Sequence, residues 1–241
     1  MRKYRLAAVA AAGVMVLAVP AGAALAAGTH NAAAKPVLRI GKTSGAAVKK
    51  GAKLSAGLAK GSKVVLVIAS GSTKYTGTCT KSSIAAKVTK NPSAKGKATL
   101  GITGETISNC TLNPVPIAGT KLTSLTPLNL PAATTVNVKG DSVTISQAKA
   151  SKPLGFKAVI DVPGVDPSLA CYYTAAKITG KFSNKAGSVT FSKQVLTLNT
   201  SLTGTTASAF CAVAGKTSTF SVAYGPVRDT SVKHHPKVYI G

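Results

Sequence analysis

Side chains that could perform acid–base catalysis are scarce in this sequence. It has 5 carboxylates and 3 histidines among 241 residues. Cleavage of a glycosidic bond needs two carboxyl groups at one bond, and the only near pair is Asp161 and Asp166. The segment between them, Val162-Pro163-Gly164-Val165, predicts a turn in which the aspartates accept backbone hydrogen bonds. Two carboxylates also supply too few oxygens for calcium, and Glu105 is expected to be a solvated hairpin residue.

Motifs for a nucleophile or a metal site are equally weak. The Gly-x-Ser-x-Gly motif of serine hydrolases is absent. Ser146 and Lys149 match the Ser-x-x-Lys pattern of penicillin-recognising enzymes, but the accompanying motifs do not follow downstream. His234 and His235 could bind a metal with His30, yet neighbouring residues of a strand face opposite sides, which favours an exposed basic tail. We therefore expect no metal, no cofactor and no enzymatic activity; a secreted hydrolase with an unrecognised site remains the alternative.

The first residues predict export. Three of the first five residues are basic, the run Leu6–Val19 is apolar and uncharged, and a proline break precedes the small residues Ala24 and Ala26. This pattern is typical of a secretory signal peptide cut after Ala26. We therefore expect a signal peptide over residues 1–26 and a flexible lead over 27–35. The mature chain would have no membrane span, and would be released or held non-covalently at the cell wall.

The elements that would position these side chains are β-strands. From Pro36 onward the apolar residues follow a period of two, and Gly, Ser, Thr, Asn and Pro interrupt the chain at short intervals. Val64–Ile68 is a continuous apolar run, which is typical of a strand covered on both faces. Gly140 and Asp141 predict a hairpin turn, and Ala46–Lys60 is interpreted as short hairpin strands. The expected fold class is all-β, an antiparallel β-sandwich-like architecture.

The β region also predicts an internal duplication. A strand, a turn beginning at Asn91 and a returning strand lie between Cys79 and Cys110, and a similar series with a turn beginning at Asn184 follows Cys171. Short β-rich segments also look alike by chance, and this alternative stays open. With duplication, a first β unit covers residues 36–150 and a second covers 151–241.

Four cysteines in an exported chain predict two disulfides. Three connectivities are possible, and the duplicated units favour Cys79 with Cys110 and Cys171 with Cys211. In the chain-entropy description each bond would add about 4 kcal/mol to stability. Zinc binding is disfavoured because no two of the cysteines are close enough in sequence to form a zinc knuckle.

Several of these residues resemble a known group of proteins. Cys171-Tyr172-Tyr173-Thr174, the strand Ser188–Phe191, Cys211 and the strand Phe220–Tyr224 resemble the C-terminal part of secreted, uncharacterised β-rich proteins of streptomycetes and related actinobacteria. Cys79, the Asn91-Pro92 turn with Gly96, and Cys110 resemble their middle part. The resemblance implies export and a β-rich fold, and it brings no active site.

The charge is the strongest remaining feature. The net charge is +25, and Lys35 to Gly104 holds 13 lysines and one arginine with no acidic residue. Such a surface attracts anionic polymers, and the residues we expect to bind them are Lys49, Lys50, Lys53, Lys60 and Lys63. Few arginines and few aromatic residues accompany these lysines, so we expect no sequence-specific nucleic-acid binding. The composition favours the other interpretation, in which the lysines serve only solubility and protect strand edges. The sequence specifies no oligomeric state.

Overall fold

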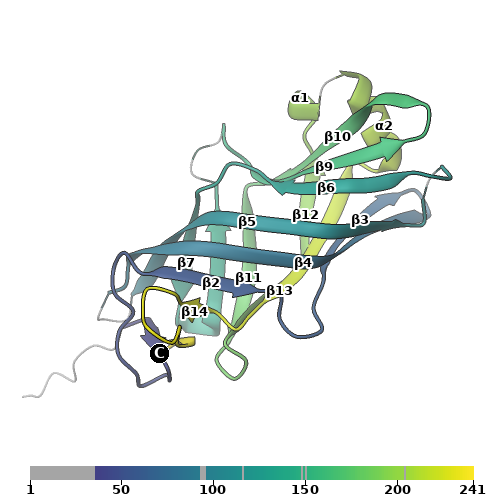
Figure 1. Ribbon diagram of the computed structural model, residues 1–241. Coiled ribbons are helices and arrows are strands. Elements are labelled where there is room, and N and C mark those ends of the chain that lie inside the picture. Colours follow the sequence, from purple (N-terminus) through teal and green to yellow (C-terminus); the bar gives the residue numbers. More distant parts are fainter. Residues whose placement is uncertain (1–35, 93–95, 116, 148, 150, 204) are drawn as a thin grey trace, which may run out of the picture. The chain divides into compact units, whose positions relative to one another are not determined.

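The computed structural model describes residues 36–241 except 93–95, 116, 148, 150 and 204. The predicted signal peptide, the flexible lead and His30 lie outside the described residues. Strands dominate, which confirms the all-β prediction (Figure 1). The strands of the first half are β1 (Leu38–Ile40), β2 (Lys53–Gly57), β3 (Val64–Ser70), β4 (Thr73–Lys90), β5 (Lys97–Asn113), β6 (Lys121–Pro127), β7 (Ala132–Asn137) and β8 (Ser142–Ser146).

The second half adds seven strands and two short helices. The strands are β9 (Leu154–Val162), β10 (Val165–Ala175), β11 (Lys177–Ser183), β12 (Ser188–Leu198), β13 (Thr217–Tyr224), β14 (Arg228–Asp229) and β15 (Val238–Ile240). The helices are α1 (Thr200–Thr203) and α2 (Thr205–Ala214), and a single 3-10 turn, Lys139–Asp141, joins β7 to β8. That turn forms the predicted hairpin, with Gly140 at φ 75°.

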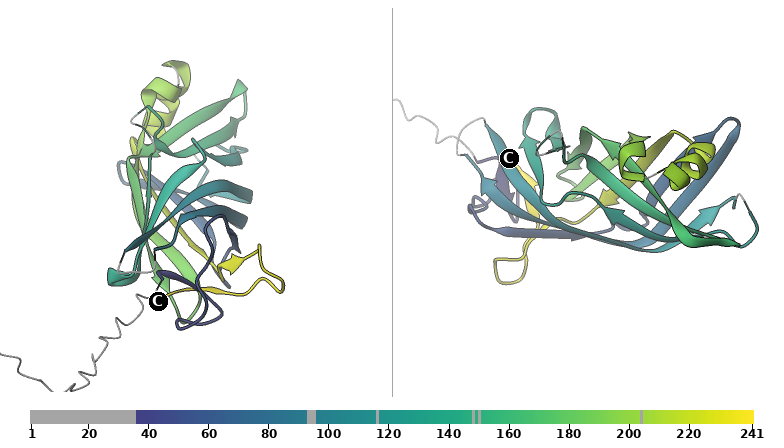
Figure 2. Two further views of the ribbon diagram at one scale, coloured as in Figure 1. Left: turned by 90° about the vertical axis from the view of Figure 1, so that its left-hand side faces the viewer. Right: turned by 90° about the horizontal axis from the view of Figure 1, so that it is seen from above.

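One antiparallel sheet contains most of these strands, and it closes on itself. Its order is β11-β8-β7-β5-β4-β3-β13-β12-β10-β9-β6, and β12 also pairs with β11. The first eight strands of this order therefore form a ring. The β4–β5 hairpin runs along its length, and β10, β9 and β6 continue beyond β12 beside the two helices (Figure 2). Residues 36–241 belong to one compact unit, and the boundary predicted after residue 150 falls between β8 and β9.

The two halves of the chain contribute the same series of strands to the sheet. In the first half β3, β4, β5 and β7 are neighbours in this order, and in the second half β9, β10, β12 and β13 are. The two series meet where β3 pairs with β13. The internal duplication stays a prediction.

Equivalent asparagines tie the hairpin turns of both halves to a separate small sheet. β1 pairs with β15, with Leu38 opposite Ile240. The Asn91 side chain accepts a bond from the Leu38 amide and donates to the Leu38 carbonyl, each at 2.9 Å. The Asn184 side chain does the same with the Ile240 amide and carbonyl, each at 2.8 Å. Each asparagine side chain thus makes the two hydrogen bonds that a residue of a neighbouring strand would make. It satisfies backbone groups of Leu38 and of Ile240 that would otherwise lack partners.

Both predicted disulfides are present, in different settings. Cys79 lies directly opposite Cys110 in the β4–β5 pair. Cys171 of β10 is bonded instead to Cys211 of α2, and both residues are fully buried. Helix α2 is therefore an addition to the expected all-β architecture. α2 is fixed by its contact with β10 and by the Tyr173 hydroxyl, which donates to the Gly215 carbonyl at 2.9 Å.

Two further expectations about the strands need correction. In β3, Val65 and Val67 are half-buried, so only the face of Val64, Leu66 and Ile68 belongs to the core. The segment Ala46–Lys60 does not form a hairpin of its own. Its one strand, β2, pairs with β4 and β14, because Leu54 and Ala56 alternate toward the interior of the ring.

Candidate functional site

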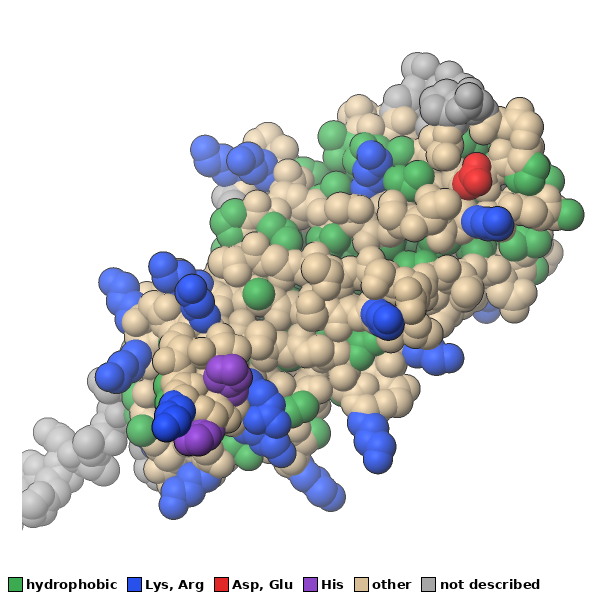
Figure 3. Space-filling model, viewed as in Figure 1, with side chains coloured by type: hydrophobic (Ala, Val, Ile, Leu, Met, Phe, Trp, Pro, Cys, Tyr) green, Lys and Arg blue, Asp and Glu red, His purple; other side chains and the backbone are tan. Residues whose placement is uncertain are grey.

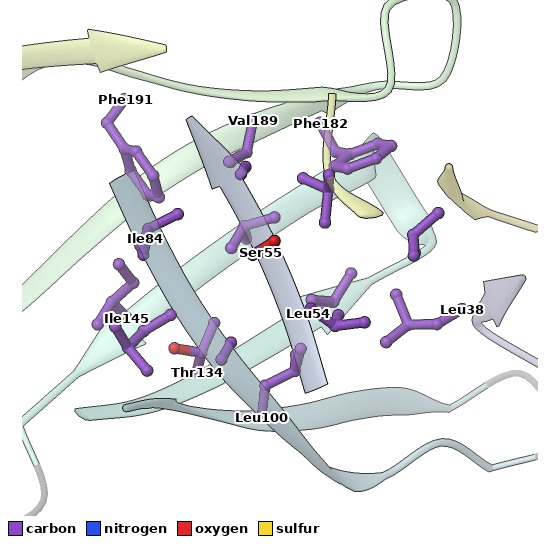
Figure 4. Close-up of a pocket in the computed structure, with 17 residues that line it drawn as sticks. Leu38, Leu54, Ser55, Ile84, Leu100, Thr134, Ile145, Phe182, Val189 and Phe191 are labelled. Carbon is purple, nitrogen blue, oxygen red and sulfur yellow. The ribbon is translucent and has the colours of Figure 1, made fainter. Parts of the chain in front are cut away.

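An apolar cavity lies inside the closed part of the sheet. Its volume is about 80 Å³. One wall comes from β2 and β4, through Leu54 and Ile84, and the opposite wall comes from β8, β11 and β12 (Figure 4). There Ile145 and Phe191 point toward Ile84 across the open space (Figure 4). The side chains alternate along each strand, so every second residue faces this interior.

Small residues on the strands and the position of the Phe191 ring leave this cavity unfilled. Ala56 of β2 and Ala86 of β4 line the cavity where larger apolar side chains would fill it. Across the sheet, Gly180 pairs with Phe191, and a Cβ at Gly180 would come within 2.8 Å of the Phe191 ring. The glycine therefore lets the ring lie flat on β11.

A second cavity adjoins the first and contains a carboxyl group. Its volume is about 40 Å³. It is lined by Glu105 and by apolar residues of β9 and of the segment before β7. Ile84, Ile102 and Ile145 line both cavities. The interior therefore offers two adjoining apolar spaces, and a single acidic side chain faces the smaller one.

A bulge turns Glu105 inward. Ala86 of β4 pairs with Ile102 of β5, but the preceding residue Ala85 pairs with Gly104, so Thr103 is an extra residue in β5. Since an extra residue reverses the alternation, Ala98, Leu100 and Ile102 face inward before the bulge, and Glu105 does so after it, directly opposite Ile84. The expectation of a solvated Glu105 was therefore wrong: the side chain is at most half-exposed and lines a cavity.

Glu105 belongs to a short chain of hydrogen bonds. The Tyr224 hydroxyl donates to the Glu105 carboxyl at 2.5 Å, and Ser82 Oγ lies 2.8 Å from the same hydroxyl. Burial raises the pKa of Glu105 from 4.5 to about 7, although the bond from Tyr224 lowers it in part. Burial, together with the nearby Glu105 carboxyl, also raises the pKa of Tyr224 far above its usual value. Glu105 therefore exchanges a proton near neutral pH, while Tyr224 stays a hydrogen-bond donor.

Among the residues that the structure describes, the other candidates do not gather around this carboxyl. Asp161 is exposed near the end of β9, and Asp229 is buried and accepts a bond from the Ser231 amide at 2.9 Å. His234 and His235 are exposed in the loop before β15. Within the described ranges, no group of three or more His, Cys, Asp or Glu side chains could hold a metal ion.

A lysine-rich surface lies at the end of the molecule that carries the two histidines, outside the cavities (Figure 3). The segments that form it are in direct contact. β2 pairs with β4 and β14, the Thr230 amide donates to the Lys53 carbonyl at 2.8 Å, and the Gly41 amide donates to the Lys237 carbonyl at 2.8 Å. We define this lysine-rich surface by its exposed basic side chains, Lys42, Lys49, Lys50, Lys53, Lys87, Lys90, Arg228, Lys233 and Lys237.

No family model, curated protein or solved structure matches the chain. The site must therefore be interpreted from its own chemistry.

The five lysines predicted to bind polyanions are all exposed, but they do not form one group. Lys49, Lys50 and Lys53 belong to the lysine-rich surface, whereas Lys60 and Lys63 lie on the separate connection between β2 and β3. Sequence reasoning missed the contribution of the second half of the chain, which comes from Arg228, Lys233 and Lys237. Their proximity arises from the β2–β14 pair, and no local pattern indicates such a long-range pairing.

The lysine-rich surface contains an unfavourable charge pair. Lys53 and Lys87 are directly opposite each other on β2 and β4, and both are exposed. Like charges at opposite positions of an antiparallel pair destabilise a sheet. By contrast, Lys121 lies opposite Asp161 in the β6–β9 pair. The nearest acidic residue in sequence to the lysine-rich surface, Asp229, is only 1% exposed and is bonded to a backbone amide.

In the part of the chain that the structure describes, none of the helices has the length and apolar character needed to cross a membrane.

Proposed function

We propose that the protein is a secreted, non-enzymatic β protein that binds anionic polymers non-specifically through its lysine-rich surface, outside the cell or at the cell envelope. The observation that carries this proposal is the uncompensated pair of Lys53 and Lys87 within nine exposed basic side chains. A surface needed only for solubility gains nothing from placing like charges opposite each other, because this arrangement lowers stability. A polyanion lying across β2 and β4 would relieve the repulsion.

The chemistry of the surface favours backbone contacts over specific recognition. Eight of its nine basic side chains are lysines, which act as flexible point charges and lack the planar fork with which arginine recognises bases. Binding would therefore depend on neutralising phosphate or carboxylate charges and would weaken as salt rises. Export is supported by the two disulfides, which are typical of oxidising compartments.

The experiment compares two triple variants of the mature protein that lose the same charge. Lys49→Gln/Lys50→Gln/Lys53→Gln removes three lysines of the lysine-rich surface, and Lys74→Gln/Lys81→Gln/Lys216→Gln removes three exposed lysines elsewhere. Binding to duplex DNA, used as a phosphate polymer of known charge spacing, is measured over a series of salt concentrations. If each lysine of the first set neutralises one phosphate, the slope of log affinity against log salt falls by about 2.7.

The control triple variant should keep a slope close to that of the unmodified protein. Equal loss in the two variants would mean that net charge alone attracts the polymer, which would refute a defined surface. Absence of binding at low salt to DNA and to a wall teichoic acid would leave solubility as the role of the lysines.

A further inference from the structure

The two cavities adjoin each other, and the wall of the smaller one carries a carboxyl group. Ile84, Ile102 and Ile145 line both, so a ligand in the smaller cavity would contact the walls of the larger one. The larger cavity is lined by apolar side chains almost throughout (Figure 4). Its few polar residues include Thr134, whose buried hydroxyl has no hydrogen-bond partner in the described part of the chain. Apolar lining with few polar groups is the usual character of small-molecule sites.

Glu105 retains hydrogen-bonding capacity toward this space. Its only hydrogen bond among the described residues comes from Tyr224. A carboxyl group has two oxygens and accepts more than one bond, so one oxygen is left for a molecule in the smaller cavity. Around it lie apolar residues such as Leu130, Leu154 and Phe156.

We propose that the interior of the ring binds a neutral aliphatic compound with one hydroxyl group, whose hydroxyl bonds to Glu105 and whose chain passes between Ile84 and Ile145 into the larger cavity. The apolar walls would remove the chain from water, and the carboxyl would orient it. A neutral head is favoured because an ion would lose its hydration between apolar walls. This site shares no residue with the lysine-rich surface and does not depend on the function proposed for it.

The experiment uses 1-octanol as the probe and a filled cavity as the test. Ala86→Leu places a larger side chain in the main cavity, and Ala85→Leu makes the same change on the adjacent residue, which is exposed on the outer face of β4. Calorimetric titration of the mature protein at pH 6 should show one saturable octanol site in the unmodified protein and in Ala85→Leu. The affinity of Ala86→Leu should be lower by tenfold or more.

The role of Glu105 is tested at pH 8.5, where its carboxylate can only accept hydrogen bonds, with heptyl methyl ether, an isomer of octanol that has no hydroxyl group to donate. The unmodified protein should bind octanol about tenfold more tightly than the ether, as expected for one hydrogen bond to a carboxyl group. Glu105→Leu should lose this preference while still binding both compounds. Circular dichroism of each variant checks that it has folded.

Three results would overturn the proposal. The first is the absence of saturable octanol binding to the unmodified protein, and the second is unchanged affinity in a folded Ala86→Leu variant. The third is tighter binding of octanoate or octylammonium than of octanol, which would replace the neutral ligand with an ionic one.

Discussion

Glu105 should make the stability of the protein fall as pH rises. Its carboxyl has a pKa of about 7 in the folded chain and an ordinary value of 4.5, so between these values the folded state binds more protons than the unfolded state. Linkage then requires that the free energy of unfolding decreases from pH 4.5 to 7. At about 1.36 kcal/mol per pH unit the loss is at most about 3 kcal/mol, and partial contact with solvent reduces it.

Glu105→Gln isolates this effect, because glutamine keeps an acceptor for the Tyr224 hydroxyl and does not titrate. Urea unfolding of both proteins at pH 4 and pH 8.5, with the disulfides intact, gives the difference in stability. We expect similar stabilities at pH 4 and a more stable variant at pH 8.5, by about 2 to 3 kcal/mol. The other carboxyl groups titrate in both proteins and cancel in the comparison. A difference that stays constant between the two pH values would refute the burial of Glu105 in an apolar wall.

The remaining predictions concern the links between distant parts of the chain. Replacing Cys171 and Cys211 with serine removes a disulfide that closes a loop with a sequence separation of 40. The free energy of unfolding, measured by urea titration, should fall by about 4 kcal/mol. An unchanged unfolding midpoint would contradict this. Asn184→Ala removes two hydrogen bonds to the backbone of Ile240 and should cost about 1 to 3 kcal/mol, with faster hydrogen exchange at the Ile240 amide. Lys185→Ala, the exposed neighbour, serves as its control.

Local patterns in the sequence were enough to predict the fold class. Alternating apolar residues and turn residues specify hairpins such as β7–β8, and the even cysteine count with the repeated spacing led to the correct disulfides. The closure of the sheet could not be predicted this way. It depends on the pairing of β12 with β11 and of β3 with β13, and these partners are chosen by packing of the whole core.

The candidate site was missed for a more specific reason. An unbroken alternation from Ile102 along β5 would place Glu105 on the outer face, and only the extra residue Thr103 turns it inward. The available signal was Gly101 and Gly104, because a glycine inside a strand often marks a bulge. Helix α2 escaped prediction because its apolar residues do not form a clear stripe with a helical period. In the structure it is held by Cys211 and by its contact with β10.

If the chain is exported as we propose, the small sheet of β1 and β15 can form only late in folding. A chain that crosses a membrane from its first residue presents Leu38 early, but the partner of Leu38, Ile240, emerges about 200 residues later. Until then Asn91 can hold the Leu38 backbone from one side only, and the Asn184 amide has no strand to bind. The hairpins can form while the chain crosses the membrane. The pairing of β1 with β15 can form only after the C-terminal segment has crossed.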